Sequence, residues 1–262
     1  MYSVRDKTVM ITGAARGIGY EFVKVLLGNG AKNVAVVDLP TSDGQNTTAA
    51  LAKEFDNRAV FFACDVTNAD ELKDTFEKIV DEFKGLDIFI NNAGMLNDKY
   101  WEQTIDLNVK ALIRGSLLAF DHMAKHKGGK GGVVLNIASI VGLHPDSFFP
   151  MYSATKHAVL GFSQSLAETY DKTGVRVVIM CPGVTTTALT VNLRDKIYDS
   201  IRPAINIADG ITRYPRQTPD VVANAMLDLI QKGQNGAAWV CEGGQAPYAV
   251  DFVHYSKRSL PV

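Results

Sequence analysis

Cysteines are few, long apolar runs are absent and the charges nearly cancel in this sequence of 262 residues. The three cysteines, Cys64, Cys181 and Cys241, cannot all pair within one chain, and each lies at the end of an apolar run. We interpret them as buried, reduced thiols, which are typical of a cytoplasmic protein. No apolar stretch approaches the roughly 18 residues of a membrane span, and the N-terminus is charged where a signal peptide would be apolar.

The balance of charges argues against a nucleic-acid partner. Lys and Arg number 27 against 28 Asp and Glu, which gives a formal net charge of −1 and no attraction to a polyanion. Hydrophobic residues make up 47% and charged residues 21%, so the chain can bury a core without disulfides or metals. Because it shows no repeat and no linker-like stretch, we predict a single domain over residues 1–262.

Short β-branched runs alternate with segments that have apolar residues at helical spacing. The runs are almost continuously apolar, as in strands covered on both faces, and span residues 8–11, 33–37, 59–62, 86–90, 132–137, 175–180 and 237–240. Segment 68–83 is typical of the helices, with Asn68 as N-cap and Glu71 at the capping-box position. The alternation predicts an α/β, Rossmann-like, doubly wound fold with a seven-stranded parallel sheet flanked by helices on both faces. In the long connection 184–218 we expect a lid over a substrate site.

A glycine-rich turn joins the first predicted strand to an amphipathic helix. Gly13, Gly17 and Gly19 would let the backbone approach a pyrophosphate closely, and the helix N-terminus offers free N–H groups and a favourable dipole. Arg16 and Ile18 complete this turn. Glycine clusters are also common in purely structural turns, but the order strand, turn, helix favours a dinucleotide site.

Asp38 closes the second predicted strand, nineteen residues after Gly19. A carboxylate there can accept hydrogen bonds from both hydroxyls of the adenosine ribose and repels a 2′-phosphate. Leu39 beside it adds no cation, whereas Arg16 could favour a phosphate. The repulsion amounts to several kcal/mol at an effective dielectric of about 20, so we predict NAD rather than NADP as the cofactor.

Tyr152 and Lys156 lie four residues apart at the start of another predicted helix, which places the phenol and the ammonium on one face. A free phenol has a pKa of about 10 and is a poor base at neutral pH. We expect the ammonium and the positive ring of an oxidised nicotinamide to lower the pKa of Tyr152, favouring the phenolate by about 3–4 kcal/mol. Such a pair is often mere surface decoration, so the interpretation depends on its companions.

Four patterns follow one another along the chain, and together they resemble the short-chain dehydrogenase/reductase family over essentially the whole sequence. Thr12-Gly13-x-x-x-Gly17-Ile18-Gly19 resembles the family's cofactor turn, and Asn91-Asn92-Ala93-Gly94 resembles its fourth-strand motif. Asn108, Ser139, Tyr152 and Lys156, with an interval of thirteen from Ser139 to Tyr152, resemble its catalytic tetrad, and Pro182-Gly183 with Thr187 resembles the segment that contacts the nicotinamide. Stretches 93–98, 133–137 and 235–239 are similar to the branch of insect-type alcohol dehydrogenases and hydroxyprostaglandin dehydrogenases.

The resemblance implies a role for each member of the tetrad. Tyr152 would take the alcohol proton as general base while hydride leaves the carbinol carbon for the nicotinamide. Ser139 would hydrogen-bond the substrate oxygen. Lys156 would hold the nicotinamide ribose and lower the pKa of Tyr152, and Asn108 would anchor a water of the proton relay; alone, that asparagine fits a helix-interior hydrogen bond equally well.

The same resemblance implies a set of cofactor-binding residues. They are Gly13, Arg16, Gly17, Ile18, Gly19, Asp38, Asp65, Val66, Asn91, Ala93, Gly94, Tyr152, Lys156, Pro182, Gly183 and Thr187. Among them, Asp65 would meet the adenine and Thr187 the carboxamide. Asn91 and Ala93 would line the adenosine ribose.

Apolar residues near the predicted catalytic groups indicate a mostly apolar substrate pocket, although they fit plain core equally well. They are Met95, Leu96, His144, Phe148, Phe149, Met151, Leu189, Leu193, Ile197, Tyr198 and Ile201. His122 and His126 could share a helix face, but no third ligand accompanies them and no cysteine pair has metal spacing. We therefore predict no metal.

The resulting prediction is NAD-dependent oxidation of a hydrophobic, secondary alcohol, so that the partner is a small alcohol or carbonyl compound. One alternative is an NADPH-dependent carbonyl reductase, against which Asp38 argues. The other is a catalytically silent dinucleotide-binding scaffold, against which the complete tetrad argues. The resemblance also implies a homo-oligomer, with a dimer favoured, but the residues themselves do not distinguish dimer from tetramer and do not name the alcohol.

Overall fold

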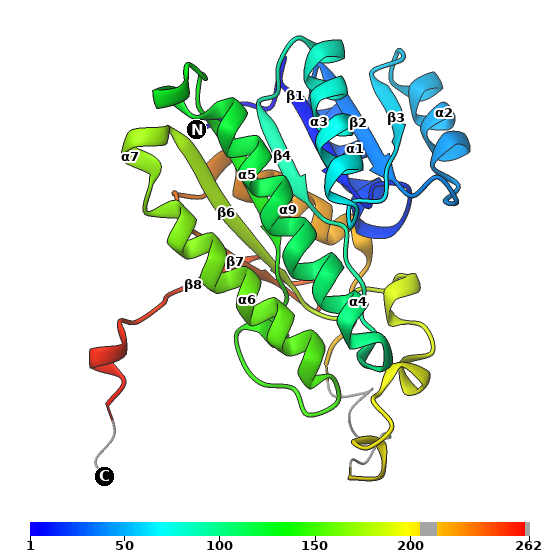
Figure 1. Cartoon of the computed structure of the whole chain (residues 1–262), viewed down its shortest axis with the longest axis vertical. Coiled ribbons are helices and arrows are strands. Elements are labelled where there is room, and N and C mark those ends of the chain that lie inside the picture. The colour runs from blue at the N-terminus through cyan, green and yellow to red at the C-terminus, as the bar shows by residue number, and fades with distance from the viewer. Residues whose placement is uncertain (205–213, 260–262) are drawn as a thin grey trace.

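One eight-stranded sheet forms the centre of the protein (Figure 1). The computed structural model describes residues 1–204 and 214–259. In it the strands run in the order β3-β2-β1-β4-β5-β6-β7-β8. Their bounds are β1 Thr8–Thr12, β2 Asn33–Asp38, β3 Ala59–Ala63, β4 Ile88–Asn91, β5 Gly132–Ile137, β6 Val175–Pro182, β7 Ala238–Cys241 and β8 Tyr248–Val250. The predicted α/β, doubly wound fold is confirmed, and its seven predicted strands pair in parallel.

The eighth strand is a feature that the prediction did not include. β8 runs antiparallel to β7 and pairs Tyr248, Ala249 and Val250 with it at the edge of the sheet. Two of these three residues are exposed and the third is half-buried. Because this edge strand is only three residues long and mostly exposed, hydrophobic periodicity gives no signal for it.

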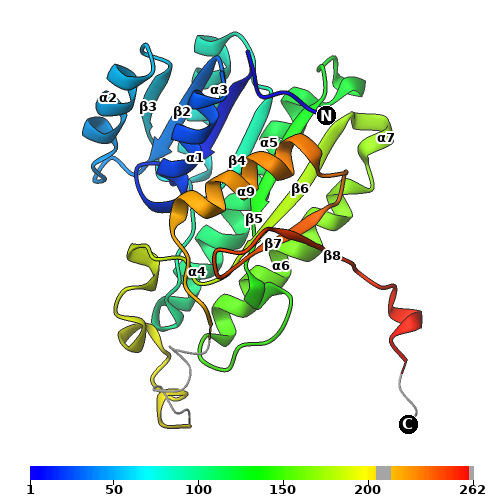
Figure 2. The same ribbon diagram turned by 180° about the vertical axis from the view of Figure 1, so that it is seen from behind.

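Helices cover both faces of the sheet. Their bounds are α1 Gly17–Gly28, α2 Gly44–Glu54, α3 Ala69–Phe83, α4 Trp101–Ile105, α5 Leu112–Met123, α6 Pro150–Ala167, α7 Tyr170–Thr173 and α9 Pro219–Lys232. Figure 1 shows α3, α5 and α6 on one face, and Figure 2 shows α1 and α9 on the other. In β1, Val9 and Ile11 pack toward α1 and α9, whereas Met10 packs toward α3 and α5. The strand is continuously apolar because both of its faces are buried.

Helix α3 agrees with the predicted segment 68–83 and starts at the predicted cap. The Asn68 side chain accepts hydrogen bonds from the N–H groups of Asp70 and Glu71. The reciprocal bond of a capping box is replaced, because the Glu71 carboxylate accepts instead from the N–H of Asp65 at 2.8 Å. Glu71 thus fixes the loop after β3, which is one wall of the site described below.

The connection 184–218 leaves the carboxyl end of β6 and returns to α9. It contains the short helices η5 Ala188–Thr190, η6 Leu193–Lys196 and η7 Arg202–Ala204, and a bridge between Thr185 and Gln217 closes its base. Residues 205–213 of the predicted lid lie outside the described part of the chain. Movement of this segment over a substrate stays a prediction.

The three cysteines are free and buried, as the sequence predicted. Within residues 1–204 and 214–259, no helix combines the length and the apolarity that crossing a membrane would require.

Candidate active site

A cavity of about 1010 Å³ opens at the carboxyl edge of the parallel strands. The sheet reverses its winding between β1 and β4, and this is where open α/β sheets bind ligands. All predicted site residues except Asn91 and Asn108 line this cavity, namely Gly13, Arg16, Gly17, Ile18, Gly19, Asp38, Asp65, Val66, Ala93, Gly94, Ser139, Tyr152, Lys156, Pro182, Gly183 and Thr187. The fold therefore gathers residues that are far apart in the sequence into one wall.

The glycine turn after β1 is needed first for packing within the protein. Gly13 has φ +64°, and a Cβ there would lie 2.8 Å from the Cα of Ala93. A Cβ on Gly19 would lie 2.3 Å from the carbonyl oxygen of Gly13. The sequence argument, that all three glycines make room for a pyrophosphate, is thus corrected for Gly13 and Gly19. A side chain at either position would collide with the protein's own backbone.

The N-terminus of α1 faces the cavity and fits an anionic group. Arg16, Gly17, Ile18 and Gly19 all contribute to the wall. The N-cap residue Arg16 makes no side-chain cap, and the first turn of α1 has no acidic residue. Its N–H groups and its dipole are therefore available to a pyrophosphate, which is what a dinucleotide cofactor would supply.

Asp38 lies beside this turn with its carboxylate held in place. Oδ2 accepts a hydrogen bond from the N–H of Ala15 at 2.8 Å, and Oδ1 accepts one from the N–H of Leu39 at 2.8 Å. The Arg16 side chain is exposed and makes no hydrogen bond or ion pair with the described residues. A fixed negative charge at the end of β2 fits ribose hydroxyls and disfavours a phosphate at the same place.

Two other residues predicted to contact the cofactor also lie in the cavity wall. Asp65 lines the wall, and its Oδ1 accepts hydrogen bonds from the N–H and the hydroxyl of Thr67 at 2.9 and 2.7 Å. Thr187 lines the wall as the N-cap of η5, where its side chain and that of Thr190 form a capping box. Both residues are positioned by local bonds and keep a surface toward the cavity.

The adjacent asparagines at the end of β4 point in opposite directions. Asn91 is buried, and its Nδ2 donates to Ser116 Oγ at 2.9 Å and to Asn136 Oδ1 at 2.8 Å. Asn92 lines the cavity instead, and its Nδ2 donates to the carbonyl of Gly13 at 2.8 Å. The prediction that Asn91 lines the ribose site is therefore corrected for its side chain. Successive side chains of a strand alternate between faces, and Asn92 is the residue that sequence reasoning missed.

The predicted catalytic side chains meet near the start of α6. Lys156 Nζ lies 5.6 Å from the centroid of the Tyr152 ring, so the spacing of four residues does place both on one face. Lys156 Nζ also donates to the carbonyl of Ile137 at 2.8 Å. Ser139 Oγ donates to the carbonyl of Pro182 at 3.5 Å. All three side chains are buried and line the cavity.

Burial controls the pKa of the tyrosine in the protein without cofactor. Burial raises the pKa of Tyr152 to about 12, and the hydrogen bond with Ser139 only partly offsets this. Burial also lowers the pKa of Lys156 to about 8. Without the cofactor, removing both groups from water penalises both charged forms, and the lowering of the Tyr152 pKa expected from Lys156 and an oxidised nicotinamide stays a prediction for the complex. A cation that binds beside Tyr152 would stabilise the phenolate.

The pH dependence of folding stability tests this burial. Between about 8, the native pKa of Lys156, and its ordinary value of 10.5, the unfolded chain holds a proton that the native chain has released. The free energy of unfolding should therefore rise with pH across this window, by on the order of 3 kcal/mol from this group. Lys156→Met lacks the group and should lack that rise. Urea unfolding of both proteins at about pH 7 and pH 10 measures the difference, and parallel changes in both would contradict the burial.

Asn108 acts on the backbone around the site and does not line the cavity. It lies in a π-helical segment, Asp106–Ala111, between α4 and α5. Its Oδ1 accepts from the N–H of Met95 at 2.9 Å, while its Nδ2 donates to the carbonyl of Met95 at 2.9 Å and to Thr155 Oγ1 at 3.1 Å. The side chain thus joins the loop after β4 to α6. Its predicted role with a relay water stays a prediction.

Asp98 is a second residue that sequence reasoning missed. Its carboxylate is fully buried and accepts hydrogen bonds from the N–H groups of Met151 at 2.9 Å and Tyr152 at 3.0 Å. Burial raises the pKa of this carboxyl, although the two hydrogen bonds counteract it. A residue 54 positions away thus caps the helix that carries Tyr152. No local sequence signal marks a cap contributed from so far along the chain.

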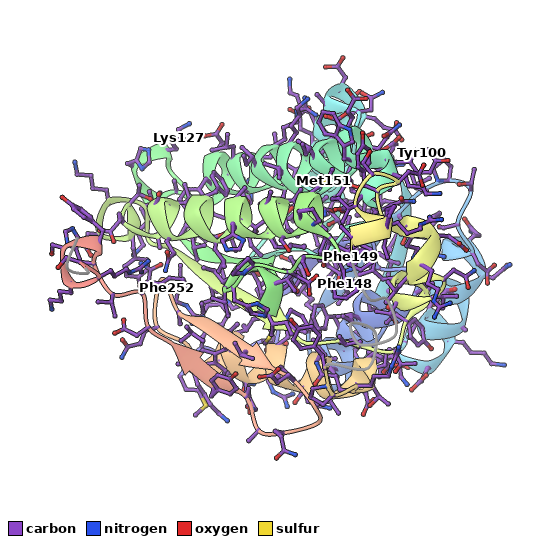
Figure 3. The ribbon with its side chains drawn as sticks, turned by 90° about the horizontal axis from the view of Figure 1, so that it is seen from below. Tyr100, Lys127, Phe148, Phe149, Met151 and Phe252 are labelled. Carbon is purple, nitrogen blue, oxygen red and sulfur yellow. The ribbon has the colours of Figure 1, made fainter. Side chains whose placement is uncertain are left out.

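The other part of the cavity wall is largely apolar, as predicted. Of the apolar residues proposed from the sequence, seven line it, namely Met95, Leu96, Phe148, Phe149, Leu189, Leu193 and Ile197. His144, Met151, Tyr198 and Ile201 do not. In Figure 3, which views the molecule from below, Phe148 and Phe149 lie at the end of α6 beside the connection 184–218. Asp146, Lys196 and Tyr214 add polar groups that the sequence did not reveal.

The residue types that ligate metals are not gathered in one place in the part of the chain that the structure describes. Among the described residues, no three His, Cys, Asp or Glu side chains lie close enough together to hold one ion. The His122 ring instead accepts a hydrogen bond from the N–H of Leu86 at 3.2 Å, and burial lowers its pKa.

The fold and the cavity define a dinucleotide-binding oxidoreductase with a serine, a tyrosine and a lysine at its centre. The chain belongs to the short-chain dehydrogenase/reductase family, because the family model for short chain dehydrogenase matches residues 7–197. It is 40% identical over 242 residues to 15-hydroxyprostaglandin dehydrogenase [NAD(+)] of Rattus norvegicus, covering 89% of this chain and 90% of the relative. It is 33% identical over 246 residues to alcohol dehydrogenase 1 of Ceratitis cosyra, covering 92% and 94%. The predicted family and branch are confirmed.

Proposed function

We propose that this enzyme oxidises an apolar, secondary alcohol to the carbonyl compound with NAD as cofactor and Tyr152 as general base. The observation that carries the proposal is the meeting of Ser139, Tyr152 and Lys156 in one cavity with the free N-terminus of α1 and Asp38. The likeness to an NAD(+)-dependent hydroxyprostaglandin dehydrogenase and to an alcohol dehydrogenase supports it.

The cofactor is held at three places. The N–H groups at the start of α1 bind the pyrophosphate, and the Asp38 carboxylate accepts from the adenosine ribose hydroxyls. Lys156 donates to the nicotinamide ribose. One of its hydrogens is already bonded to the carbonyl of Ile137, and its pKa of about 8 keeps it protonated at neutral pH. When bound, NAD supplies the acceptor for the hydride of the alcohol.

Side chains of the protein bind the alcohol oxygen and remove its hydroxyl proton. Ser139 hydrogen-bonds the substrate oxygen and keeps it in place in both the alcohol and the carbonyl state. Tyr152 takes the hydroxyl proton as the carbinol carbon loses its hydride. Because burial raises the pKa of Tyr152 to about 12 despite the hydrogen bond with Ser139, the phenolate form depends on the positive charge of the oxidised nicotinamide. Asp98 holds the start of α6 in place through the N–H of Tyr152, and Asn108 holds the loop after β4 in place through the N–H of Met95.

The direct test is oxidation of simple alcohols by the purified protein. 2-Octanol with NAD at mildly alkaline pH should give NADH, measured by its absorbance, and 1-octanol should be a poorer substrate if the enzyme prefers secondary alcohols. The reverse reaction with 2-octanone and NADPH is the matched assay for the reductase alternative. Clear NADPH-dependent reduction without NAD-dependent oxidation would overturn the proposal.

We further propose that the enzyme is a homodimer in the cytoplasm. The family to which the chain belongs supports self-association, and the three free, buried cysteines fit a reducing compartment. Sedimentation at several protein concentrations measures the oligomeric state, and a monomer at assay concentrations would contradict the dimer.

A further inference from the structure

A carboxylate lies in the interior where the helix of the predicted base begins. Asp98 is 0% exposed, and its short helix η1, Asp98–Tyr100, contacts α6. Figure 3 shows Tyr100 of η1 and Met151 of α6 at this end of the helix. In the described ranges 1–204 and 214–259, no cation forms an ion pair with Asp98. A buried charge without a cation is costly, so the hydrogen bonds of Asp98 have to offset that cost.

These hydrogen bonds come from the first N–H groups of α6. Pro150 is the first residue of the helix and has no N–H, and Phe149 before it makes no side-chain cap. The N–H of Met151 donates to Asp98 Oδ2 at 2.9 Å, and the N–H of Tyr152 donates to Oδ1 at 3.0 Å. The positive end of the helix dipole also favours a carboxylate there. Asp98 therefore does for α6 what an N-cap residue does for other helices.

The cap of α3 shows how the cap of α6 differs. The Asn68 side chain accepts from the N–H groups of Asp70 and Glu71 on one oxygen, at 3.1 and 3.2 Å. Asp98 instead gives each N–H an oxygen of its own, at shorter distances. Two acceptors on one planar carboxylate fix both the place and the direction of the helix start. Because a neutral side chain is enough to cap α3, helix formation alone does not require a buried charge.

The carbonyl of Tyr152 is held as well. Thr155 Oγ1 donates to this carbonyl at 2.7 Å and accepts from Asn108 Nδ2 at 3.1 Å. Both Thr155 and Asn108 are buried. Since Asp98 binds the N–H of the same residue, both polar backbone groups of Tyr152 have side-chain partners. The backbone that carries the phenol is thus held from two sides.

The segment that contains Asp98 is itself fixed in place. On one side, the buried Thr104 donates from its hydroxyl to the carbonyl of Asn97 at 2.9 Å. On the other side, Lys99 forms an ion pair with Asp199 of the connection 184–218 at 3.5 Å. Because Asn97 lines the cavity, Asp98 joins the cavity wall to the start of α6.

We propose that Asp98 is a positioning residue of the reaction, which keeps the phenol of Tyr152 where it can take the proton of the alcohol. The inference rests on the proposed function, in which Tyr152 is the general base. Asp98 does not line the cavity, so it acts through Tyr152 and not on the ligands. Displacing a reacting group by about 1 Å can lower a rate by about 100-fold, and a loosened helix start permits such a displacement.

The experiment measures turnover per intact site in two variants of Asp98. Asp98→Ala removes both acceptors, whereas Asp98→Asn keeps the shape of the side chain and one acceptor oxygen. Titration with NADH counts the sites, and kcat for 2-octanol is measured at saturating NAD. We expect kcat per site to fall by about 10- to 100-fold in Asp98→Ala and by about three- to tenfold in Asp98→Asn. KM for NAD should stay within about twofold, because the cofactor site is unchanged.

Asn68→Ala is the matched control. It removes a cap with two hydrogen bonds from α3, a helix without a predicted catalytic residue, so it should lower the midpoint of thermal unfolding and leave kcat per site unchanged. If both Asp98 variants keep the kcat per site of the wild type, Asp98 is only a structural cap and the inference is wrong. If Asn68→Ala loses as much turnover per site as Asp98→Ala, the effect is not specific to α6 and the inference is also wrong. If Asp98→Ala does not fold, the isosteric Asp98→Asn decides.

The wild type and Tyr152→Phe separate this inference from the proposed function. If the wild type oxidises 2-octanol, Tyr152→Phe does not, and both Asp98 variants match the wild type, the inference alone fails. If the wild type does not oxidise 2-octanol with NAD, or if Tyr152→Phe does so at the wild-type rate, the proposed function fails and the positioning role fails with it.

Discussion

Tyr152→Phe should lower kcat for 2-octanol oxidation by about 100- to 10,000-fold, the usual contribution of a general base, while KM for NAD stays within about twofold. The substitution removes one oxygen from a side chain that is 8% exposed. The ring still fills its place near Lys156, so the fold and the cofactor site should persist. Initial rates with saturating NAD, together with cofactor binding measured separately, distinguish loss of the base from loss of binding.

The pKa values explain why this effect should be large. In the protein alone, the pKa of Tyr152 is about 12 because of burial, so a neutral solution contains almost no phenolate. Only the phenolate can accept the proton, and the rate should therefore rise with pH through the pKa that the phenol has in the complex. An apparent pKa well below 12 in the wild-type profile, and its absence from Tyr152→Phe, would assign the missing stabilisation to the positive charge of the bound cofactor.

Tyr170→Phe provides the control for this experiment. Tyr170 is 41% exposed at the start of α7 and does not line the cavity, so its substitution should leave kcat unchanged. Turnover of Tyr152→Phe within a few-fold of the wild type would show that another group takes the proton. The proposed mechanism would then have to be abandoned, although the family assignment would stand.

Asp38→Asn should reduce the preference for NAD over NADP by about 100-fold. The change removes a negative charge at the place where NADP carries its 2′-phosphate, and such a repulsion is worth several kcal/mol at an effective dielectric of about 20. Part of the change should appear as weaker NAD binding. The amide can replace only one of the two acceptors that hold the N–H groups of Ala15 and Leu39.

The ratio of kcat/KM values for the two cofactors is the measurement, because it cancels general damage to the cavity. Asp65→Asn is the matched control, since Asp65 is a neighbouring acid in the same wall whose carboxylate is bonded to Thr67. It should change the ratio far less. An unaltered ratio in Asp38→Asn would show that Arg16 or the surrounding backbone selects the cofactor.

Much of the fold could be predicted because local physical chemistry dictates it. The apolar runs of β1 to β7 appear in the sequence since both faces of those strands are buried, and Asn68 marks the start of α3 through its hydrogen bonds to the next turn. β8 gives no such signal, because a short, exposed edge strand buries almost nothing. Its place depends on pairing with β7 alone.

The sequence by itself determined the α/β, doubly wound fold class, the glycine turn, Asp38 and the pair Tyr152 and Lys156. Each of these appears as a local pattern with a characteristic spacing. Only the tertiary structure decided which of Asn91 and Asn92 faces the cavity, that Asp98 caps α6, and that Lys196 lies in the apolar wall. It also buries Tyr152, which raises the pKa of this phenol to about 12 in the protein without cofactor. Burial, direction of side chains and contacts between distant segments arise when the chain packs, so spacing along the sequence does not contain them.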